Sequence, residues 1–202
     1  LIVSVLSAAL CTYFSTMTAY AIHAYDFKLK KYIYAFILAV MMIPTQVTAL
    51  GFVKLVGTLK MEDTFIPLIV PTIAAPVTFF YMKQYMESTL PVSLIEAARI
   101  DGLTEYGIYF RVVLPLAKGG IATLIISSFV TVWNDFMGPL IYLSSLEKKT
   151  LQLGLRMFIS QYSSEYNLIM AASIVSLIPV FVMFAALQKF FTEGIAASGI
   201  KG

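Results

Sequence analysis

The segment EAARIDGLTEYGIYFRVVLP, residues 96–115, is a charged stretch that interrupts an otherwise apolar sequence. Residues 83–118 around it carry four basic and four acidic side chains: Lys83, Arg99, Arg111 and Lys118 against Glu87, Glu96, Asp101 and Glu105. A charge at the centre of a bilayer costs roughly 2.5 to 3.5 kcal/mol. This stretch must therefore lie in water or against protein, between two membrane-embedded parts of the chain.

The remaining sequence has the composition of an integral membrane protein. Hydrophobic residues make up 59% of the 202 residues and charged residues only 12%, whereas a soluble domain is about one quarter charged. A spanning helix needs roughly 20 apolar residues, and five segments qualify: about 2–22, 32–53, 65–82, 119–143 and 166–188. The sequence predicts one all-α transmembrane helix bundle over residues 1–202.

Prolines within these segments predict bends, because proline removes a backbone donor. They are Pro44, Pro67, Pro71, Pro76, Pro139 and Pro179. Membrane helices are in general richer in proline than soluble ones, so a single bend need not have a role in transport.

The distribution of Lys and Arg predicts the orientation, since cytoplasmic loops are enriched in both. Nine of the fourteen fall on the side of the 83–118 loop and five on the other side. We therefore expect the 83–118 loop to be cytoplasmic and residues 144–165 to form an external loop. Five spans then leave Leu1 outside, which predicts a six-span parent with one further helix before it.

The local pattern of the charged loop predicts a helix, a glycine turn and a second helix. Pro91 suits the first turn of a helix over about 91–101, and Gly102 suits the left-handed position after its end. Thr104 is a suitable N-cap and Glu105 suits the positive end of the second helix, which we expect to end at Pro115. Small side chains at Ala97 and Ala98 would let another backbone approach closely.

The spacing of this loop resembles the signature of the membrane subunits of bacterial ATP-binding-cassette importers. Three residues separate Glu96-Ala97-Ala98 from Gly102, and nine more precede Val112 and then Leu114-Pro115. Further stretches resemble the maltose-type, carbohydrate-importing branch, close to the smaller of its two membrane subunits. These stretches are Ala19-Tyr20-Ala21, Trp133-Asn134-Asp135-Phe136 with Pro139-Leu140, and Glu193-Gly194-Ile195 to Gly199-Ile200-Lys201-Gly202. Val112 departs from the usual isoleucine, and the first helix of the family is absent from this sequence.

The resemblance implies a bacterial or archaeal inner-membrane permease that works with a second related permease, two ATPase subunits and an external solute-binding protein. It implies that the 83–118 loop is a coupling loop docked on an ATPase subunit, with these residues involved: Glu96, Ala97, Ala98, Asp101, Gly102, Leu114 and Pro115. It implies that Gln152, Arg156, Gln161 and Tyr162 contact the binding protein and that Gly199, Lys201 and Gly202 contact the ATPase subunits. A solvated connector and a disordered terminus are the simpler alternatives for the last two segments.

Trp133, Asn134 and Asp135 are candidates for the translocation path, because Asp135 is a carboxylate predicted deep inside a span. Such a residue should face the bundle interior or water. It could equally be a polar clamp to a neighbouring helix, and Trp133 could serve packing. A rival function is a secondary transporter in which Asp135 carries a proton or sodium ion.

Other features exclude several kinds of chemistry. The sequence has no G-x-x-x-x-G-K-[ST] phosphate loop, so we expect Mg-ATP to bind only on the partner ATPase and this chain not to be an enzyme. One cysteine, Cys11, and one histidine, His23, offer no catalytic or metal-binding constellation; we expect a core residue and an interfacial residue. We expect lipid and a sugar as further partners, and no nucleic acid. Glycerol phosphate, amino acids and peptides remain alternative cargoes.

Overall fold

The computed structural model describes residues 1–156 and 166–199, and in residues 191–199 only the backbone. Within these ranges the chain forms helices and no strand. The longer helices are α1 (Ile2–Ala24), α2 (Lys30–Met41), α3 (Thr45–Thr58), α5 (Pro76–Thr89), α6 (Val92–Ile100), α9 (Lys118–Trp133) and α12 (Tyr166–Gly199). The shorter ones are α4 (Ile66–Ile69), η1 (Val70–Ile73), α7 (Glu105–Ile108), η2 (Tyr109–Val113), α8 (Leu114–Leu116), α10 (Met137–Tyr142), η3 (Leu146–Lys148) and α11 (Leu151–Leu155).

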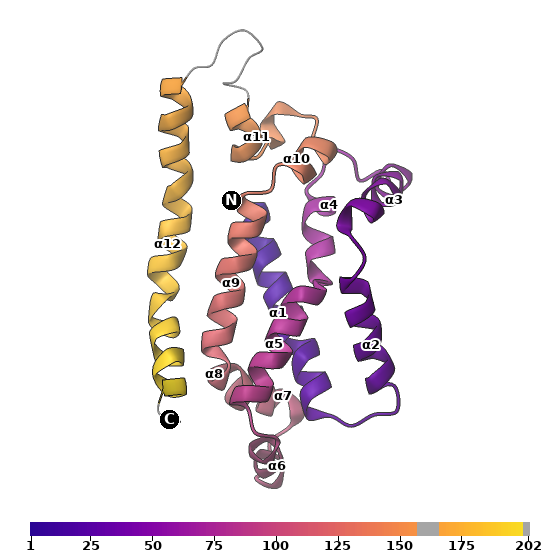
Figure 1. Cartoon of the computed structure of the whole chain (residues 1–202), viewed down its shortest axis with the longest axis vertical. Helices are drawn as coiled ribbons and strands as arrows, with labels where there is room; N and C mark the ends of the chain where they lie inside the picture. The colour runs from indigo at the N-terminus through magenta and orange to yellow at the C-terminus, as the bar shows by residue number, and fades with distance from the viewer. Residues whose placement is uncertain (157–165, 200–202) are drawn as a thin grey trace.

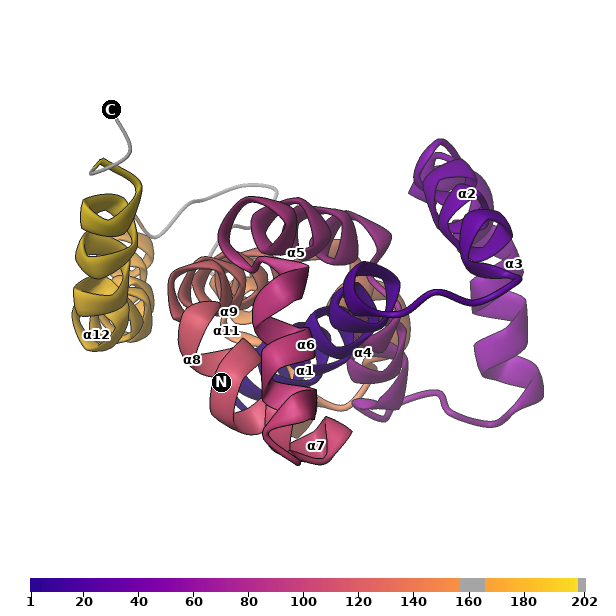
Figure 2. The same ribbon diagram turned by 90° about the horizontal axis from the view of Figure 1, so that it is seen from below.

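Helix α1 is the centre of the bundle, with α5 and α9 packed against it. Helix α12 contacts α9, and in both ribbon views α12 lies on one side of this group and α2–α3 on the other (Figures 1 and 2). Among the described residues, three stretches are long and apolar enough to cross a membrane: Ile2–Ala24, Ile66–Thr89 and Tyr166–Phe190. Two bent helix pairs raise the number of candidate spans to five if each pair is one span.

The predicted span over 32–53 is two helices rather than one. Helices α2 and α3 meet at an angle of 96°, and Pro44 stands directly before α3 with an extended backbone. Because proline cannot donate a backbone hydrogen bond and disfavours a helical residue before it, the helix stops here and restarts in a new direction.

The predicted bounds of two further spans also differ in the structure. The third span runs through α4, η1 and α5 as far as Thr89, so it extends beyond the predicted end at residue 82. The fourth does not continue to residue 143, because α9 ends at Trp133 and α10 begins at Met137. Residues 134–136 lie in a break between the two helices.

Small and hydroxyl side chains let the central helices approach each other closely, as is common in membrane bundles. The buried face of α1 includes Ser4, Ser7, Cys11 and Ser15. A Cβ at Gly120 of α9 would lie 2.7 Å from the Tyr85 ring of α5. The prediction that Cys11 is a core residue is confirmed.

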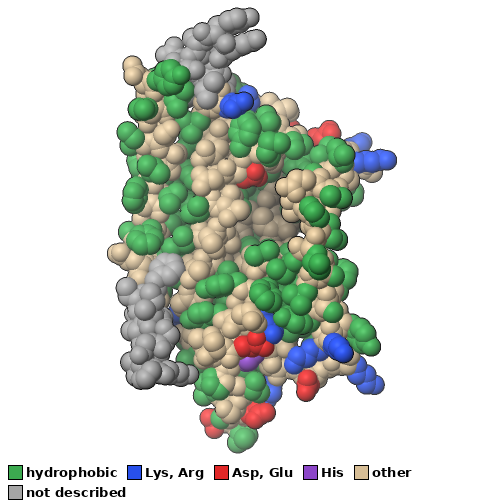
Figure 3. All heavy atoms as spheres, viewed as in Figure 1, with side chains coloured by type: hydrophobic (Ala, Val, Ile, Leu, Met, Phe, Trp, Pro, Cys, Tyr) green, Lys and Arg blue, Asp and Glu red, His purple; other side chains and the backbone are tan. Residues whose placement is uncertain are grey.

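The two ends of the bundle carry the charged groups, with an apolar band between them (Figure 3). Helices α6, α7 and α8 lie at one end, together with the last described turn of α12 (Figure 1). The start of α1, α10 and α11 lie at the other end, as does the turn between α3 and α4. The charged loop and the segment after α10 therefore lie at opposite ends of the bundle.

Candidate functional site

The charged loop has the predicted helix, glycine turn and N-cap. Helix α6 is followed by Gly102 with φ of +82°, a conformation that side-chain-bearing residues rarely adopt. The Thr104 hydroxyl then accepts a hydrogen bond from the Gly107 N–H at 3.2 Å, which satisfies one free donor at the start of α7. The loop therefore reverses direction in a defined way and projects α6 from the bundle.

The second helix of the loop does not end at Pro115, contrary to the prediction. Residues 109–113 form a π-turn in which the Leu114 N–H bonds to the Tyr109 carbonyl, and α8 continues through Pro115 to Leu116. A π-turn adds one residue to a helical turn. This changes the hydrogen-bond pattern just before Pro115, which has no backbone N–H to donate. The chain then bends by 79° into α9.

The two faces of α6 have different environments. Ile95 is fully buried and Ala98 is 8% exposed, both within a core shared with α1 and α5. Glu96, Ala97, Asp101 and Gly102 are exposed, and Ile100 is 86% exposed. The candidate coupling residues thus divide into an outward set and the inward-facing Ala98.

Leu114 and Pro115 lie further along the chain, beyond the π-turn. Leu114 is half-buried against the same core, whereas Pro115 is exposed. The signature proline is thus available to a partner, while the leucine before it holds the loop on the bundle. The sequence pattern did not identify Ile100 as a candidate site. Its exposure depends on which face α6 turns away from the bundle, and its apolar side chain alone does not predict this.

Glu105 fixes the base of the loop. Its carboxylate accepts bonds from Arg99 Nε at 2.7 Å and Arg99 Nη2 at 3.3 Å, and from the hydroxyls of Tyr20 and Tyr25. Arg99 lies on α6, Tyr20 lies on α1, and Tyr25 directly follows the end of α1. The Arg99 guanidinium, with the Tyr25 hydroxyl, lowers the pKa of Glu105 in this loop outside the spans.

A second tie joins α1 to the start of α6. His23 Nε2 lies 2.8 Å from the Leu90 carbonyl oxygen, just before Pro91. With Glu105, this contact holds the loop to the end of α1 at two places. A force on α6 therefore reaches α1 and α5 through buried side chains and hydrogen bonds.

The path candidates Trp133, Asn134 and Asp135 lie at the opposite end of the bundle. Trp133 stacks on Phe129 with ring centroids 5.8 Å apart and donates from Nε1 to the Ser176 carbonyl of α12 at 3.1 Å. Asp135 lies in the break between α9 and α10 rather than within a helix, and its Oδ1 accepts the Gly138 N–H at 3.3 Å.

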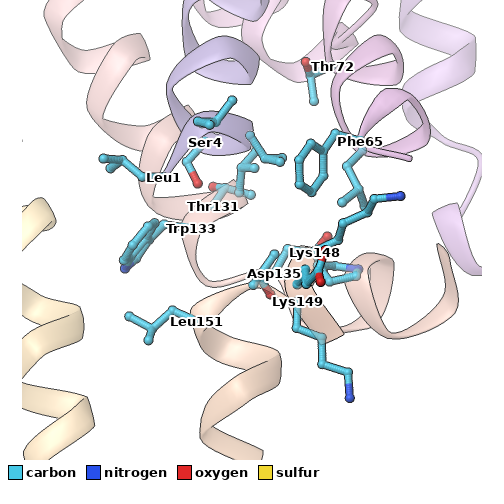
Figure 4. A pocket seen from close by; sticks show the side chains of 17 residues that line it. Leu1, Ser4, Phe65, Thr72, Thr131, Trp133, Asp135, Lys148, Lys149 and Leu151 are labelled. Carbon is cyan, nitrogen blue, oxygen red and sulfur yellow. The ribbon is translucent and has the colours of Figure 1, made fainter. Parts of the chain in front are cut away.

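Asp135 and Trp133 nevertheless line a cavity of about 450 Å³ at this end. Figure 4 shows Trp133 and Asp135 around it with Ser4, Thr72 and Thr131, and with Lys148 and Lys149 near Asp135. The cavity is therefore formed by α1, η1, α9 and the segment after α10.

The structure brings two of the external-loop candidates next to the break after α9. Gln152 Nε2 donates to Asn134 Oδ1 at 3.2 Å, and the Arg156 guanidinium lies 5.7 Å from the centre of the Phe136 ring. Gln161, Tyr162, Lys201 and Gly202 lie outside the described residues, and Gly199 is the last residue of α12.

Asp63, which sequence reasoning missed, joins two connections at this end. It accepts the N–H groups of Ser144 at 3.0 Å and Ser145 at 2.9 Å, the Ser145 hydroxyl, and Lys148 Nζ at 2.9 Å. These hydrogen bonds lower the pKa of Asp63 well below its usual value, and the bond from the Ser145 hydroxyl has the largest effect. About 80 residues of sequence separate the partners, so no local pattern could reveal the contact.

Within the described ranges, no three His, Cys, Asp or Glu side chains are placed to hold a metal ion together. What the structure presents is a projecting helical loop at one end of the bundle and a cavity at the other.

Comparison with known proteins agrees with this arrangement. Residues 11–196 match the family model of the binding-protein-dependent transport system inner membrane component. The arabinooligosaccharides transport system permease protein AraQ of Bacillus subtilis is 37% identical over all of this chain and 72% of its own length. The melibiose/raffinose/stachyose import permease protein MelC of the same organism is 32% identical over all of this chain and 74% of its own length.

A solved structure supports the fold. A bacterial ABC transporter involved in the import of the acidic polysaccharide alginate matches with a TM-score of 0.75 and 23% identity, over 94% of this chain and 74% of that one. The family match, the relatives and the projecting loop lead to one conclusion: the chain is a multi-pass membrane protein that belongs to the family of binding-protein-dependent transport system inner membrane components.

Proposed function

We propose that this chain is the permease subunit of an ATP-driven importer whose cargo is a sugar or oligosaccharide. The cargo assignment is supported by relatives named for arabinooligosaccharides and for melibiose, raffinose and stachyose. The observation that carries the coupling role is the projecting α6, whose outer face is exposed while its inner face is part of the bundle core.

The chain would work as one of two related permeases, each docked on an ATPase subunit that holds Mg-ATP. The outward residues Glu96, Ala97, Asp101 and Gly102 enter the ATPase surface, with Ile100 as an apolar anchor. The exposed Pro115 of α8 would add a separate contact. Charged contacts at the rim of such an interface fix orientation more than affinity. Ala98 and Leu114 support the loop from within.

Coupling then follows from how the loop is attached. Closure of the ATPase subunits moves α6, and Ile95, Ala98 and the Arg99–Glu105 pair transmit that movement to α1 and α5. The bundle thereby changes between inward-open and outward-open states. Such a shift requires the ATPase to bind the two states with different affinity.

The other end of the molecule suits exchange with an external solute-binding protein. Gln152 and Arg156 lie on the segment that borders the cavity of Asp135, so a docked protein would face its mouth. We extend this role to Gln161 and Tyr162, and we assign an ATPase contact to the tail with Gly199, Lys201 and Gly202.

Replacing Gly102 tests the coupling role. Gly102→Val places a β-branched residue at φ +82°, where left-handed backbone costs roughly 1 to 2 kcal/mol, and should distort the turn. We expect uptake by the reconstituted importer to fall well below the wild-type rate while basal ATPase activity continues. Gly102→Asn is the matched control, because asparagine tolerates this conformation, and it should retain most uptake.

Radiolabelled arabino- or galacto-oligosaccharide uptake, measured beside ATP hydrolysis in the same vesicles, gives both readouts. Wild-type coupling in Gly102→Val would show that the turn does not transmit the movement. Uptake driven by an ion gradient without ATP would overturn the ATP-driven assignment altogether.

A further inference from the structure

A second cavity of about 330 Å³ adjoins the first and lies between α1, α5 and α9, together with η1. Six of its lining residues carry hydroxyl groups: Ser7, Thr72, Thr78, Ser127, Ser128 and Thr131. Thr72, Thr131 and Val132 line both cavities, and Figure 4 shows Thr72 and Thr131 in the same view as Asp135 and Lys149. The two cavities therefore adjoin at these three residues, and we refer to them together as the groove.

The hydroxyl groups of the groove have free capacity to accept hydrogen bonds. Thr72 and Thr131 donate to carbonyls of their own helical segments, at 2.6 Å to Ile69 and 2.8 Å to Ser127. A hydroxyl has one proton and two lone pairs, so their oxygens remain acceptors. Ser7 Oγ has no hydrogen-bond partner among the described residues, but it is fully buried, so it is not one of the acceptors that a cargo could reach.

Charge distinguishes the deep part of the groove from its mouth. Asp135, Glu147, Lys148 and Lys149 border the outer cavity. Among the described residues that line the deeper cavity, none is Lys, Arg, Asp or Glu. An ionised cargo would lose water there without gaining a counter-charge, which is unfavourable, whereas a hydroxyl-rich neutral cargo could replace its water with these acceptors.

We propose that this groove is the wall that the subunit contributes to the translocation path, and that it suits neutral, polyhydroxylated cargo over phosphorylated or zwitterionic cargo. The proposal rests on the importer function given above and deepens it. It places the cargo against Thr131, Ser127 and Thr78, one to two helical turns inward from Asp135.

Single cysteines test whether the groove conducts. In a Cys11→Ala background, with the other subunits free of reactive cysteines, Ser127→Cys replaces a hydroxyl by a thiol, and Thr131→Cys also removes one methyl group. Both positions are exposed, so the fold should be preserved. We expect both to react with a charged, water-soluble thiosulfonate reagent, to lose that labelling when sugar is trapped with nucleotide, and to lose uptake once labelled.

Val5→Cys is the matched control, since Val5 lies on α1, is 45% exposed and borders neither cavity. Its labelling should not respond to sugar, and uptake should survive. If Ser127→Cys and Thr131→Cys stay unreactive in every nucleotide state, or react without any effect of sugar or on uptake, the face packs against the second permease and the proposal is wrong.

The same vesicles separate this proposal from the importer function. If the wild-type protein takes up no sugar, but the Ser127→Cys and Thr131→Cys variants still become labelled at a nucleotide-dependent rate, the sugar cargo is rejected. If the wild type takes up sugar but the two cysteine variants do not react with the reagent, the importer function stands and only the groove proposal is rejected.

Discussion

Two carboxylates organise opposite ends of this molecule. Glu105 ties α6 and α7 to α1 through Arg99 and two tyrosines, and Asp63 ties the α3–α4 turn to the segment after α10. Asp63 has φ of +54°, a left-handed conformation that Asp and Asn tolerate better than most residues. Its backbone conformation and its charge are both needed for the clamp.

Replacing Asp63 by asparagine tests the charge alone, because size and backbone tolerance are kept. The lowered pKa means that the clamp stabilises the fold above the unfolded value of about 3.9 and loses this contribution as the pH falls through the folded value. We therefore expect wild-type protection of the Ser144 and Ser145 amides from hydrogen exchange to be equal at pH 5 and pH 8.

Asp63→Asn should lower that protection several-fold at both pH values, since the ion pair with Lys148 is lost. Glu62→Gln, at an exposed neighbouring position, should leave it unchanged. A loss of protection in the wild type between pH 8 and pH 5 would contradict the assigned direction of the pKa shift.

The sequence predicted those features of the loop that depend only on neighbouring residues. Gly102 and Thr104 were predicted in their observed roles, because a left-handed glycine and an N-cap follow from a few neighbouring residues. Asp63 could not be predicted, since its partners lie about 80 residues away. The inward orientation of Ala98 also depends on tertiary packing, which sequence spacing does not specify.

At the level of elements, hydropathy located the membrane-embedded segments but not their breaks. The predicted span over 119–143 has Pro139 near its end, yet α9 ends earlier, at Trp133, directly before Asn134 and Asp135. The end coincides with the Trp133 contact to Ser176 and the Asp135 bond to Gly138. The polar pair Asn134 and Asp135 is thus part of the break, although the average hydropathy of the segment predicts one continuous span.

Contact between α5 and α9 depends on one glycine. Gly120→Ala would place a Cβ 2.7 Å from the Tyr85 ring, close to its attachment to the backbone, so the helices must separate. We expect a destabilisation of about 1 to 3 kcal/mol, as for overpacked cores. Gly51→Ala, in α3 with open space around the added carbon, is the control and should be neutral or slightly stabilising.

Thermal unfolding of the purified subunits in detergent measures both variants. Equal melting temperatures for Gly120→Ala and Gly51→Ala would mean that α5 and α9 accommodate the added carbon without a loss of stability.

At the level of the whole molecule, the charge bias and the fold give one orientation. The loop with α6 lies on the Lys- and Arg-rich face, and the Asp63 clamp lies on the other (Figures 1 and 3). We expect Glu62→Cys, in a Cys11→Ala background, to react with a membrane-impermeant reagent added outside spheroplasts.

Ser93→Cys, exposed on α6, should react only in inside-out vesicles. The reverse pattern would invert the topology and would place the coupling loop out of reach of any cytoplasmic ATPase.

The central position of α1 also has a consequence for biosynthesis. Its polar face, with Ser7, Thr12, Ser15 and Thr16, is covered by α5 and α9, which are made later. Roughly 110 residues separate the ends of α1 and α9, and at about 5–20 residues per second the ribosome needs on the order of 5 to 20 s to add them. During that interval the polar face of α1 lacks the cover of α9, so its hydroxyl groups depend for hydrogen bonds on carbonyls of their own helix, on water or on the insertion machinery.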